Sequence, residues 1–415
     1  MRKEKAGNHR SPNYYAVKNL FSSKPALFSL GIISLAIFTA LFGYLIMPDN
    51  TPNANDGAVQ IQKQPPGFEV TFIKIRKNIE MKQRSWISRA LYGQESPYII
   101  VPVDSWHIEG TQLIADIFGK QNYIQTYDLP DATLAMSMVG DHDQQSTTDP
   151  KPYRLEQDNI HYVDLAGTMQ TVPLSEVENI FKKSNVEKRT FLLGTDRAGR
   201  DLLSRLIFGT RISLAIGLVS VCISLFLGLI IGSLGGFFGG KIDALVVWFM
   251  SVIWSIPGIM LVIAISIALQ SRGVWVAFVA VGLSMWVDIA RVVRGQIMTV
   301  KEKSYIEAAR AFGYSNFRIM FRHILPNIMG PLIVTATVNF ASAIMLEAGL
   351  SFLGLSVQPP TPSWGIMIFE GFNAIGTRNS MHLILFPGIA ICTLVMAFNI
   401  LGNSLRDAFD PNNSF

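Results

Sequence analysis

Long runs without a charged side chain constrain this chain more than any other feature of its sequence. Six such runs occur, at residues 25–48, 212–240, 244–271, 273–287, 323–346 and 379–405. An apolar helix of about 20 residues crosses the hydrocarbon core of a bilayer, whereas a charge at its centre is costly. Charged residues make up only 16% of the chain, against about a quarter in soluble domains. We therefore expect a multi-pass, all-α membrane protein.

The six runs predict membrane helices at about 25–48, 212–234, 244–269, 273–293, 327–350 and 382–404. The fourth helix reaches membrane length only by including Asp288 and Arg291, which are three residues apart and are predicted to pair across one turn. A seventh apolar run, 348–369, contains three prolines and is predicted to be a loop. Cys222 and Cys392 lie within apolar runs and are predicted to be buried.

Basic residues in short loops indicate the topology, because such loops stay in the cytoplasm. If the N-terminus is cytoplasmic, the short outer loops contain only Arg272 and Arg378. The first apolar run is longer than the core of a signal peptide, so it is predicted to be a retained anchor. We expect a cytoplasmic N-terminal tail (1–24) and C-terminal tail (406–415), with residues 49–207 outside the cytoplasm. The basic residues that this topology places inside are Arg2, Lys3, Lys5, Arg10, Lys18, Lys24, Lys241, Arg291, Arg294, Lys301, Lys303, Arg310, Arg318, Arg322 and Arg406.

Residues 49–190 have the composition of a soluble domain. They contain 14 basic and 19 acidic residues, although the whole chain has a net charge of +5. The basic excess therefore lies in the cytoplasmic parts, and it does not indicate a nucleic-acid partner. Strand-like runs at 70–75, 98–103, 123–127 and 160–165 predict an inserted α+β domain.

The same segment contains one predicted helix. The ends of the inserted domain can also be predicted. Ser175 and Glu178 have the spacing of a capping box ahead of an apolar helix face. Residues 49–66 and 139–152 are predicted to be polar linkers, and 191–211 an interfacial segment before the second membrane helix. We refer to residues 49–190 as the insert.

Two short motifs point to ligand binding but match poorly. Gly140–Asp143 contains carboxylates and a histidine, but a solvated turn is the commoner role for such a tetrapeptide. Residues 235–241 match a phosphate-binding loop, yet Ile242 replaces the Ser or Thr that would bind magnesium. The chain contains no recognisable catalytic motif, and no bound metal or cofactor is predicted.

Four glycines repeat every four residues. Gly228, Gly232, Gly236 and Gly240 would therefore share one helix face. Small residues at this spacing let neighbouring membrane helices approach closely. The repeat predicts a packing seam in a helix bundle.

Residues 293–326 are predicted to form a cytoplasmic loop with two short helices. Ser304 is placed as the N-cap of the first helix, and Gly313 suits the left-handed residue that ends it. Pro326 is predicted to stop or kink the second helix where the next span begins. Small side chains beside Glu307 leave a thin surface that suits docking into another protein, although an ordinary interfacial hairpin remains an alternative.

This loop resembles a known motif. Glu307-Ala308-Ala309, then Gly313, then His323-Ile-Leu-Pro-Asn327 resembles the coupling motif of ATP-binding cassette (ABC) importer permeases. A strict match would have Ile at position 323, and the histidine resembles the version in C-type subunits of dipeptide and oligopeptide permeases. The resemblance extends to Leu193–Asp196, Gly199–Arg205, Glu347–Leu355 and Val357–Gly365, but it does not include most of the insert.

The resemblance implies a permease with six membrane helices of the type I importer fold, in a bacterial inner membrane. It implies three kinds of partner besides the lipid bilayer: a homologous B-type permease subunit, two cytoplasmic ATPases that use ATP and Mg²⁺, and an extracytoplasmic substrate-binding protein. Pairing with a second copy of this chain is left open. The residues expected to couple to the ATPases are Glu307, Ala308, Ala309, Arg310, Gly313, His323, Leu325 and Pro326. Those expected in the translocation path or in helix pairing are Trp286, Asp288 and Glu347.

Several alternatives remain at this point. Related permeases share these motifs, so nickel, murein peptides or antimicrobial peptides are alternatives to ordinary peptides. A membrane-anchored sensor or enzyme that acts through the insert is a second class of function. An autonomous channel is a third, although it would not explain a docking hairpin.

Overall fold

The computed structural model describes residues 18–81, 84–120, 123–137, 152–271, 273–377 and 379–409. Within these residues, five helices are long and apolar enough to cross a membrane, and one helix pair bent by 90°, either a broken span or a re-entrant loop, meets the same criteria together. The chain divides into two compact units, a membrane unit (Met1–Ala40, Gly209–Phe369, Pro387–Phe415) and a second unit (Leu41–Phe208, Glu370–Phe386). Gly140–Asp143, Arg272 and Arg378 lie outside the described residues.

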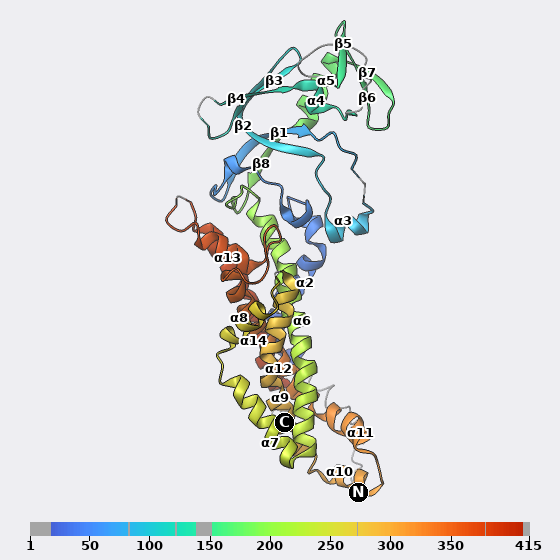
Figure 1. Ribbon diagram of the computed structural model, residues 1–415, viewed down its shortest axis with the longest axis vertical. Helices are drawn as coiled ribbons and strands as arrows, with labels where there is room; N and C mark the ends of the chain where they lie inside the picture. Colours follow the sequence, from blue (N-terminus) through green and yellow to red (C-terminus); the bar gives the residue numbers. More distant parts are fainter. Residues whose placement is uncertain are drawn as a thin grey trace, which may run out of the picture. The chain divides into compact units, whose positions relative to one another are not determined.

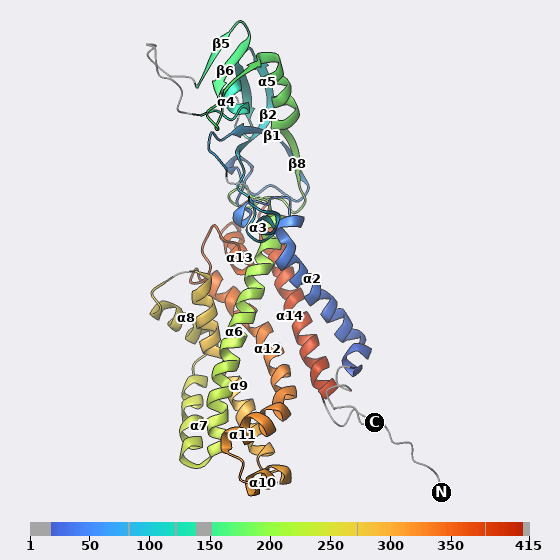
Figure 2. The ribbon, with the colours of Figure 1, turned by 90° about the vertical axis from the view of Figure 1, so that its right-hand side faces the viewer.

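The helices of the membrane unit follow the apolar runs of the sequence (Figures 1 and 2). Several of them, namely α2, α6, α13 and α14, also contribute residues to the second unit. Their bounds are α2 (Lys24–Ile46), α6 (Leu202–Phe238), α7 (Gly240–Trp254), α8 (Gly258–Ala268), α9 (Val274–Val300), α10 (Ser304–Ala311), α11 (Asn316–Ile319), α12 (Leu325–Phe352), α13 (Trp364–Phe372) and α14 (His382–Phe409).

Helix α9 forms the centre of the membrane unit. In its most apolar 18-residue stretch, 61% of the helix is buried, against 22% for α2 and α14. The exposed side chains of α2 and α14 include Phe38 and Ile389, as expected for helices that face lipid. Cys222 and Cys392 are also exposed, so the prediction that they are buried was wrong. In a membrane, an apolar residue is as stable against lipid as in the protein core.

Small residues let α6 approach α9 closely. A Cβ atom added to Gly232 would lie 2.5 Å from the carbonyl oxygen of Ala290 on α9. At Gly228 and Gly236 the added atom would meet α9 at 2.6 Å and 2.8 Å. Gly240 has no part in this contact, because it begins α7 with φ +56° and has no neighbour within 4 Å of an added Cβ. The seam therefore contains three of the four repeated glycines.

The helix boundaries differ from the sequence expectation in several places. Helix α6 begins at Leu202, so the last part of the predicted interfacial segment 191–211 is helical. The predicted span 244–269 is two helices that meet at a 90° bend beside Pro257, which lacks the N–H needed to continue α7. Helices α12 and α13 enter the run 348–369 from both ends, so only its proline-containing middle is a loop.

The second unit contains two antiparallel sheets. The larger has the strand order β4-β3-β2-β1-β8 and the smaller the order β5-β6-β7. Each of the four strand-like runs of the sequence overlaps a strand, namely β1, β2, β4 and β6. The strand bounds are β1 (Phe68–Arg76), β2 (Tyr98–Glu109), β3 (Gln112–Ile117), β4 (Ile124–Asp128), β5 (Tyr153–Glu156), β6 (Asn159–Val163), β7 (Met169–Pro173) and β8 (Val186–Phe191), and the short helices are α3 (Trp86–Tyr92), α4 (Leu129–Thr133) and α5 (Leu174–Ile180).

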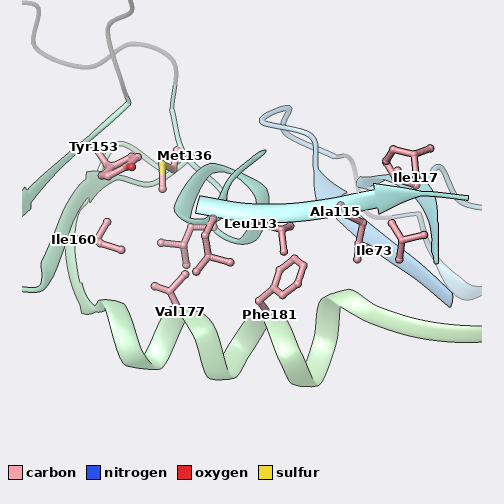
Figure 3. Close-up of a cluster of buried hydrophobic side chains, with 13 residues drawn as sticks. Ile73, Leu113, Ala115, Ile117, Met136, Tyr153, Ile160, Val177 and Phe181 are labelled. Carbon is pink, nitrogen blue, oxygen red and sulfur yellow. The ribbon is translucent and has the colours of Figure 1, made fainter. Parts of the chain in front are cut away.

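One face of the larger sheet is covered by α5 (Figure 3). Val177 and Phe181 point toward Leu113 and Ala115 of β3, and all four side chains are buried in one cluster. Helix α5 has no side-chain N-cap, contrary to the placement of Ser175. The N–H of Leu174 donates instead to a carbonyl oxygen in the β5–β6 turn, which satisfies the first helical donor.

The other face of the larger sheet is covered by the segment that follows α2. Ile61 of this segment is buried with Phe72 of β1 and Phe191 of β8. The prediction of a polar linker at 49–66 was therefore wrong. Ala58 and Ile61 of the segment pack against the sheet, which fixes the start of the insert.

The packing seam predicts that Gly232→Ala destabilises the protein, because the added methyl group would overlap the backbone of α9. Overpacking of this kind costs about 1–3 kcal/mol. We expect a lower melting temperature of the detergent-solubilised chain, measured by light scattering.

Gly295→Ala is the matched control, because Gly295 lies in α9 with nothing within 4 Å of an added Cβ. Alanine has the higher helix propensity, so this variant should melt at the same temperature or higher. Equal losses in both variants would contradict a seam at Gly232.

Candidate functional site

Helix α10 is held by its apolar face. Ile306 and Ala309 are buried in one cluster with Val293 and Ile297 of α9 and Ile328 of α12. Protein interiors are close-packed, so a helix seated this way follows the elements that it touches. Helix α10 is therefore fixed to the ends of both α9 and α12.

The opposite face of α10 is open to solvent. Glu307, Ala308 and Arg310 are exposed, and beside them the ring of Phe312 is 80% exposed. An aromatic ring in water next to a small-residue surface is typical of an interaction site. We call Glu307, Ala308, Arg310 and Phe312 the α10 surface.

A tight turn ends α10. Gly313 adopts φ +76°, a conformation that other residues rarely accept. Its N–H donates to the carbonyl oxygen of Arg310 at 2.9 Å, and the next N–H donates to that of Ala309 at 3.2 Å. Ser304 does not cap the other end, because it is already helical and Lys303 occupies the N-cap without a side-chain bond.

The residues after this turn pack on one another. The Tyr314 ring stacks on His323 with centroids 5.9 Å apart, and the guanidinium of Arg318 lies 4.2 Å from the centroid of the same ring. Asn327 donates to the carbonyl oxygen of His323 at 2.6 Å. His323 therefore stabilises this turn by packing against Tyr314.

Pro326 does not stop the helix that contains it. Residues 316–352 form one helical run, in which Met320–Ile324 is a π turn. The wider turn accommodates the proline ring and its missing N–H at the start of α12. Leu325 beside it packs against the α9–α10 cluster.

A polar cavity lies at the bend between α7 and α8. It has a volume of about 290 Å³, and its polar lining comes from Ser284 and Asp288 of α9 and Asn339 and Ser342 of α12. Asn339 is only 6% exposed, and its Nδ2 has no hydrogen-bond partner among the described residues. A buried unpaired amide is costly, so this cavity is suited to a polar occupant.

Asp288 makes no ion pair with Arg291, contrary to the sequence expectation. The guanidinium of Arg291 lies 3.8 Å from the centroid of the Trp254 ring on α7 instead. Cation–π contact with a ring from another helix thus replaces the local pair. Asp288 is left as an exposed carboxylate at the cavity.

The two other candidates for the path lie outside the cavity lining. Trp286 is 4% exposed and stacks on Phe249 of α7 at 5.5 Å, so it packs between helices. Glu347 is fully buried and accepts a 2.7 Å hydrogen bond from Ser351 on its own helix. The start of α13 approaches α12 at this point, since a Cβ added to Gly365 would meet Ser351 at 2.7 Å.

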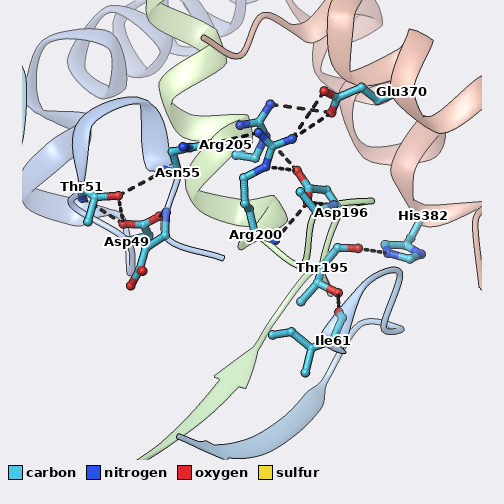
Figure 4. Close-up of polar contacts among 12 residues, drawn as sticks. Asp49, Thr51, Asn55, Ile61, Thr195, Asp196, Arg200, Arg205, Glu370 and His382 are labelled. Atoms are coloured by element: carbon cyan, nitrogen blue, oxygen red, sulfur yellow. Dashed lines mark hydrogen bonds and ion pairs between the residues drawn. The ribbon is translucent and has the colours of Figure 1, made fainter. Parts of the chain in front are cut away.

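Charged residues of the motif at 193–205 meet in a buried ionic cluster within the second unit (Figure 4). Asp196 pairs with Arg200 at 2.6 Å and with Arg205 at 3.2 Å. Glu370 receives the other ends of the same guanidinium groups at 3.3 Å and 3.7 Å. Two carboxylates thus neutralise two buried cations, and Asn55 accepts a further bond from Arg200.

Neighbouring polar groups fix the start of α6. Asp201 accepts a 2.8 Å bond from the N–H of Ser204, and burial raises the pKa of the Asp201 carboxyl. The hydroxyl of Ser204 also accepts from the N–H of Asp49 at 2.9 Å. His382 lies 3.2 Å from the carbonyl oxygen of Thr195. Glu370, Asp49 and His382 were not identified from the sequence as part of this cluster. Each is a polar residue next to an apolar run, and this position was the only indication of its role.

Comparison with known proteins places this chain in a family. Residues 224–414 match the family described as "binding-protein-dependent transport system inner membrane component". The di/tripeptide transport system permease protein DppC of Pseudomonas aeruginosa is 43% identical over 53% of this chain and 72% of its own length. The glutathione transport system permease protein GsiD of Pectobacterium atrosepticum is 41% identical over 53% and 72%. The oligopeptide transport system permease protein OppC of Bacillus subtilis is 36% identical over 56% and 75%.

These matches cover most of each relative but only about half of this chain, and the family model includes α9, α10, the cavity lining and α12. Helices α9, α10 and α12 and the α10 surface thus lie in the matched part, whereas α2 lies before it. The chain belongs to the family of binding-protein-dependent transport system inner membrane components.

Proposed function

We propose that this chain is a permease subunit of an ATP-driven ABC importer that moves peptides across the bacterial inner membrane. Its family membership, with peptide permeases at up to 43% identity among the relatives, is the observation that carries the proposal. The membrane unit then follows the type I importer fold. A B-type permease subunit forms the other half of the path, and an extracytoplasmic protein delivers the substrate.

The α10 surface is the proposed contact with the ATPases. Glu307, Arg310 and the thin surface at Ala308 are exposed, while the buried side of α10 is fixed to α9 and α12. ATP and Mg²⁺ are bound by the partner ATPases, and this chain binds no cofactor of its own. Movement of the ATPases on closure would shift α10 and, with it, the ends of two membrane helices.

The cavity at the α7–α8 bend is the proposed polar part of the path. Its polar lining comes from α9 and α12, the same two helices that pack against α10. A shift of these helices would therefore change the cavity, which couples ATP use to exposure of the path. In the proposed topology both termini are cytoplasmic and residues 49–207 are extracytoplasmic.

The proposed substrate predicts that a strain lacking this chain loses uptake of radiolabelled di- and oligopeptides. Restoring the gene should restore uptake, and uptake of nickel ions should be the same in both strains. Loss of nickel uptake with normal peptide uptake would refute the substrate assignment.

The proposed coupling contact predicts that Glu307→Arg abolishes peptide uptake and transport-linked ATP hydrolysis, with the chain still inserted in the membrane. Gly313→Pro should do the same, because proline cannot adopt the positive φ of this turn. A tenfold drop in the rate of peptide uptake corresponds to a loss of about 1.4 kcal/mol in coupling free energy.

Glu302→Arg is the control for this charge reversal, since Glu302 is exposed just before α10 and outside the α10 surface. It should retain uptake. Normal ATP hydrolysis and uptake in Glu307→Arg would show that α10 is not the coupling element.

The proposed path predicts that Asp288→Asn lowers peptide uptake about tenfold, because hydrogen bonds to charged groups contribute about 1.5–3 kcal/mol. Co-purification of the ATPases should be unchanged, which separates this variant from Glu307→Arg. Trp286→Phe keeps a buried ring against Phe249 and should transport normally. Equal uptake by Asp288→Asn and the wild type would exclude Asp288 from the path.

A further inference from the structure

Helix α3 of the insert exposes large apolar side chains. Trp86 is 72% exposed, Ile87 54% and Tyr92 63%, and only Ala90 of this helix is buried. Such side chains are costly in water when no partner covers them. Arg84 just before the helix and Arg89 within it are also exposed.

The helix is held firmly in place. The hydroxyl of Ser85 caps its first turn, and Arg84 donates to the carbonyl oxygens of Tyr92 and Gly93 at 3.1 Å and 3.2 Å. The exposed side chains are therefore presented by an ordered element with bonds at both ends.

The residue after α3 touches the last turn of α2. A Cβ atom added to Gly93 would lie 2.7 Å from the Tyr44 ring and 2.5 Å from the carbonyl oxygen of Asn50. Gly93 also has φ +69°, and the N–H of Gln94 donates to Asn50 at 3.0 Å. Figures 1 and 2 both show α3 beside this end of α2.

The end of α2 lies at the surface of the membrane. The helix has 23 residues, or about 35 Å at 1.5 Å per residue, which matches a hydrocarbon core of about 30 Å. No charged residue occurs between Lys24 and Asp49, so the apolar layer ends close to Met47. Tyr44 is in the last turn, and its contact with Gly93 puts α3 at the boundary between lipid and water.

We propose that α3 is a membrane anchor of the insert, which lies in the lipid headgroup layer on the side where α2 ends. Trp86 and Ile87 reach the upper acyl chains, Tyr92 lies at the headgroup level beside Gly93, and Arg84 and Arg89 face lipid phosphates. Aromatic rings with an apolar body and a polar tip favour this layer, and arginine pairs well with phosphate. The anchor is independent of the transported substrate.

The test uses the full-length chain in lipid nanodiscs. Cys222 and Cys392 are exposed and are first replaced by serine, so that one introduced cysteine can carry an environment-sensitive dye. Ile87→Cys is the test position. Met169→Cys is the control, because Met169 is 69% exposed on β7 of the same unit, where it is opposite Val163 of β6.

The anchor predicts that the dye at position 87 emits at shorter wavelength than the dye at position 169. It should be quenched by lipids brominated near the headgroup and protected from iodide in the buffer, and position 169 should show the reverse. Tyr92→Cys should report the same location as Ile87→Cys, which shows that the helix, and not the dye, sets the position.

Quenching by iodide at both positions 87 and 92, with no effect of brominated lipid, would overturn the proposal. Protection at position 87 that appears only when the purified substrate-binding protein is added would also overturn it, because α3 would then be a protein-docking surface. Melting temperatures equal to that of the cysteine-free parent confirm that each labelled variant is folded.

Discussion

The packing of α9 against its neighbours is the interaction on which the membrane unit depends. Its buried face receives three glycines of α6, and Ser224 of α6 donates a 2.7 Å bond to the carbonyl oxygen of Gly282. Close backbone approach strengthens dispersion contacts, which replace the hydrophobic effect as the force between helices in lipid. The same helix lines the polar cavity with Asp288 and seats α10 with Val293 and Ile297. One rigid element thus connects the proposed path to the proposed site of energy input.

The buried ionic cluster imposes a different constraint on the second unit. Burying two arginines is unfavourable unless each charge is balanced and hydrogen-bonded. Asp196 and Glu370 provide that balance, although they are far apart in the sequence. Removal of either carboxylate would leave two buried cations with a single counter-charge, which is far more costly than loss of a surface pair. The cluster therefore specifies how residues 196–205 and Glu370 meet.

The sequence predicted the apolar helices well because membrane insertion depends on composition over about 20 residues. Features decided by a single contact were predicted poorly. The charge-free run that set the second predicted span begins after Arg211, yet α6 starts at Leu202 and contains Arg205, whose charge is neutralised by Asp196 and Glu370. Arg291 was assigned to Asp288 at helical spacing, but the Trp254 ring of another helix is its actual partner. The turn at Gly313 was predictable because its positive φ is a local property of the backbone.

The insert shows why exposure must be interpreted differently in the two units. On α2 an exposed phenylalanine such as Phe38 is expected, because lipid surrounds the helix. On a domain with the composition of residues 49–190, an exposed tryptophan at Trp86 requires a partner. Asn50, which follows α2, bonds to Gln94, which follows α3, so the exposed ring lies within reach of the membrane surface. Lipid is the partner that this position supplies without any further protein.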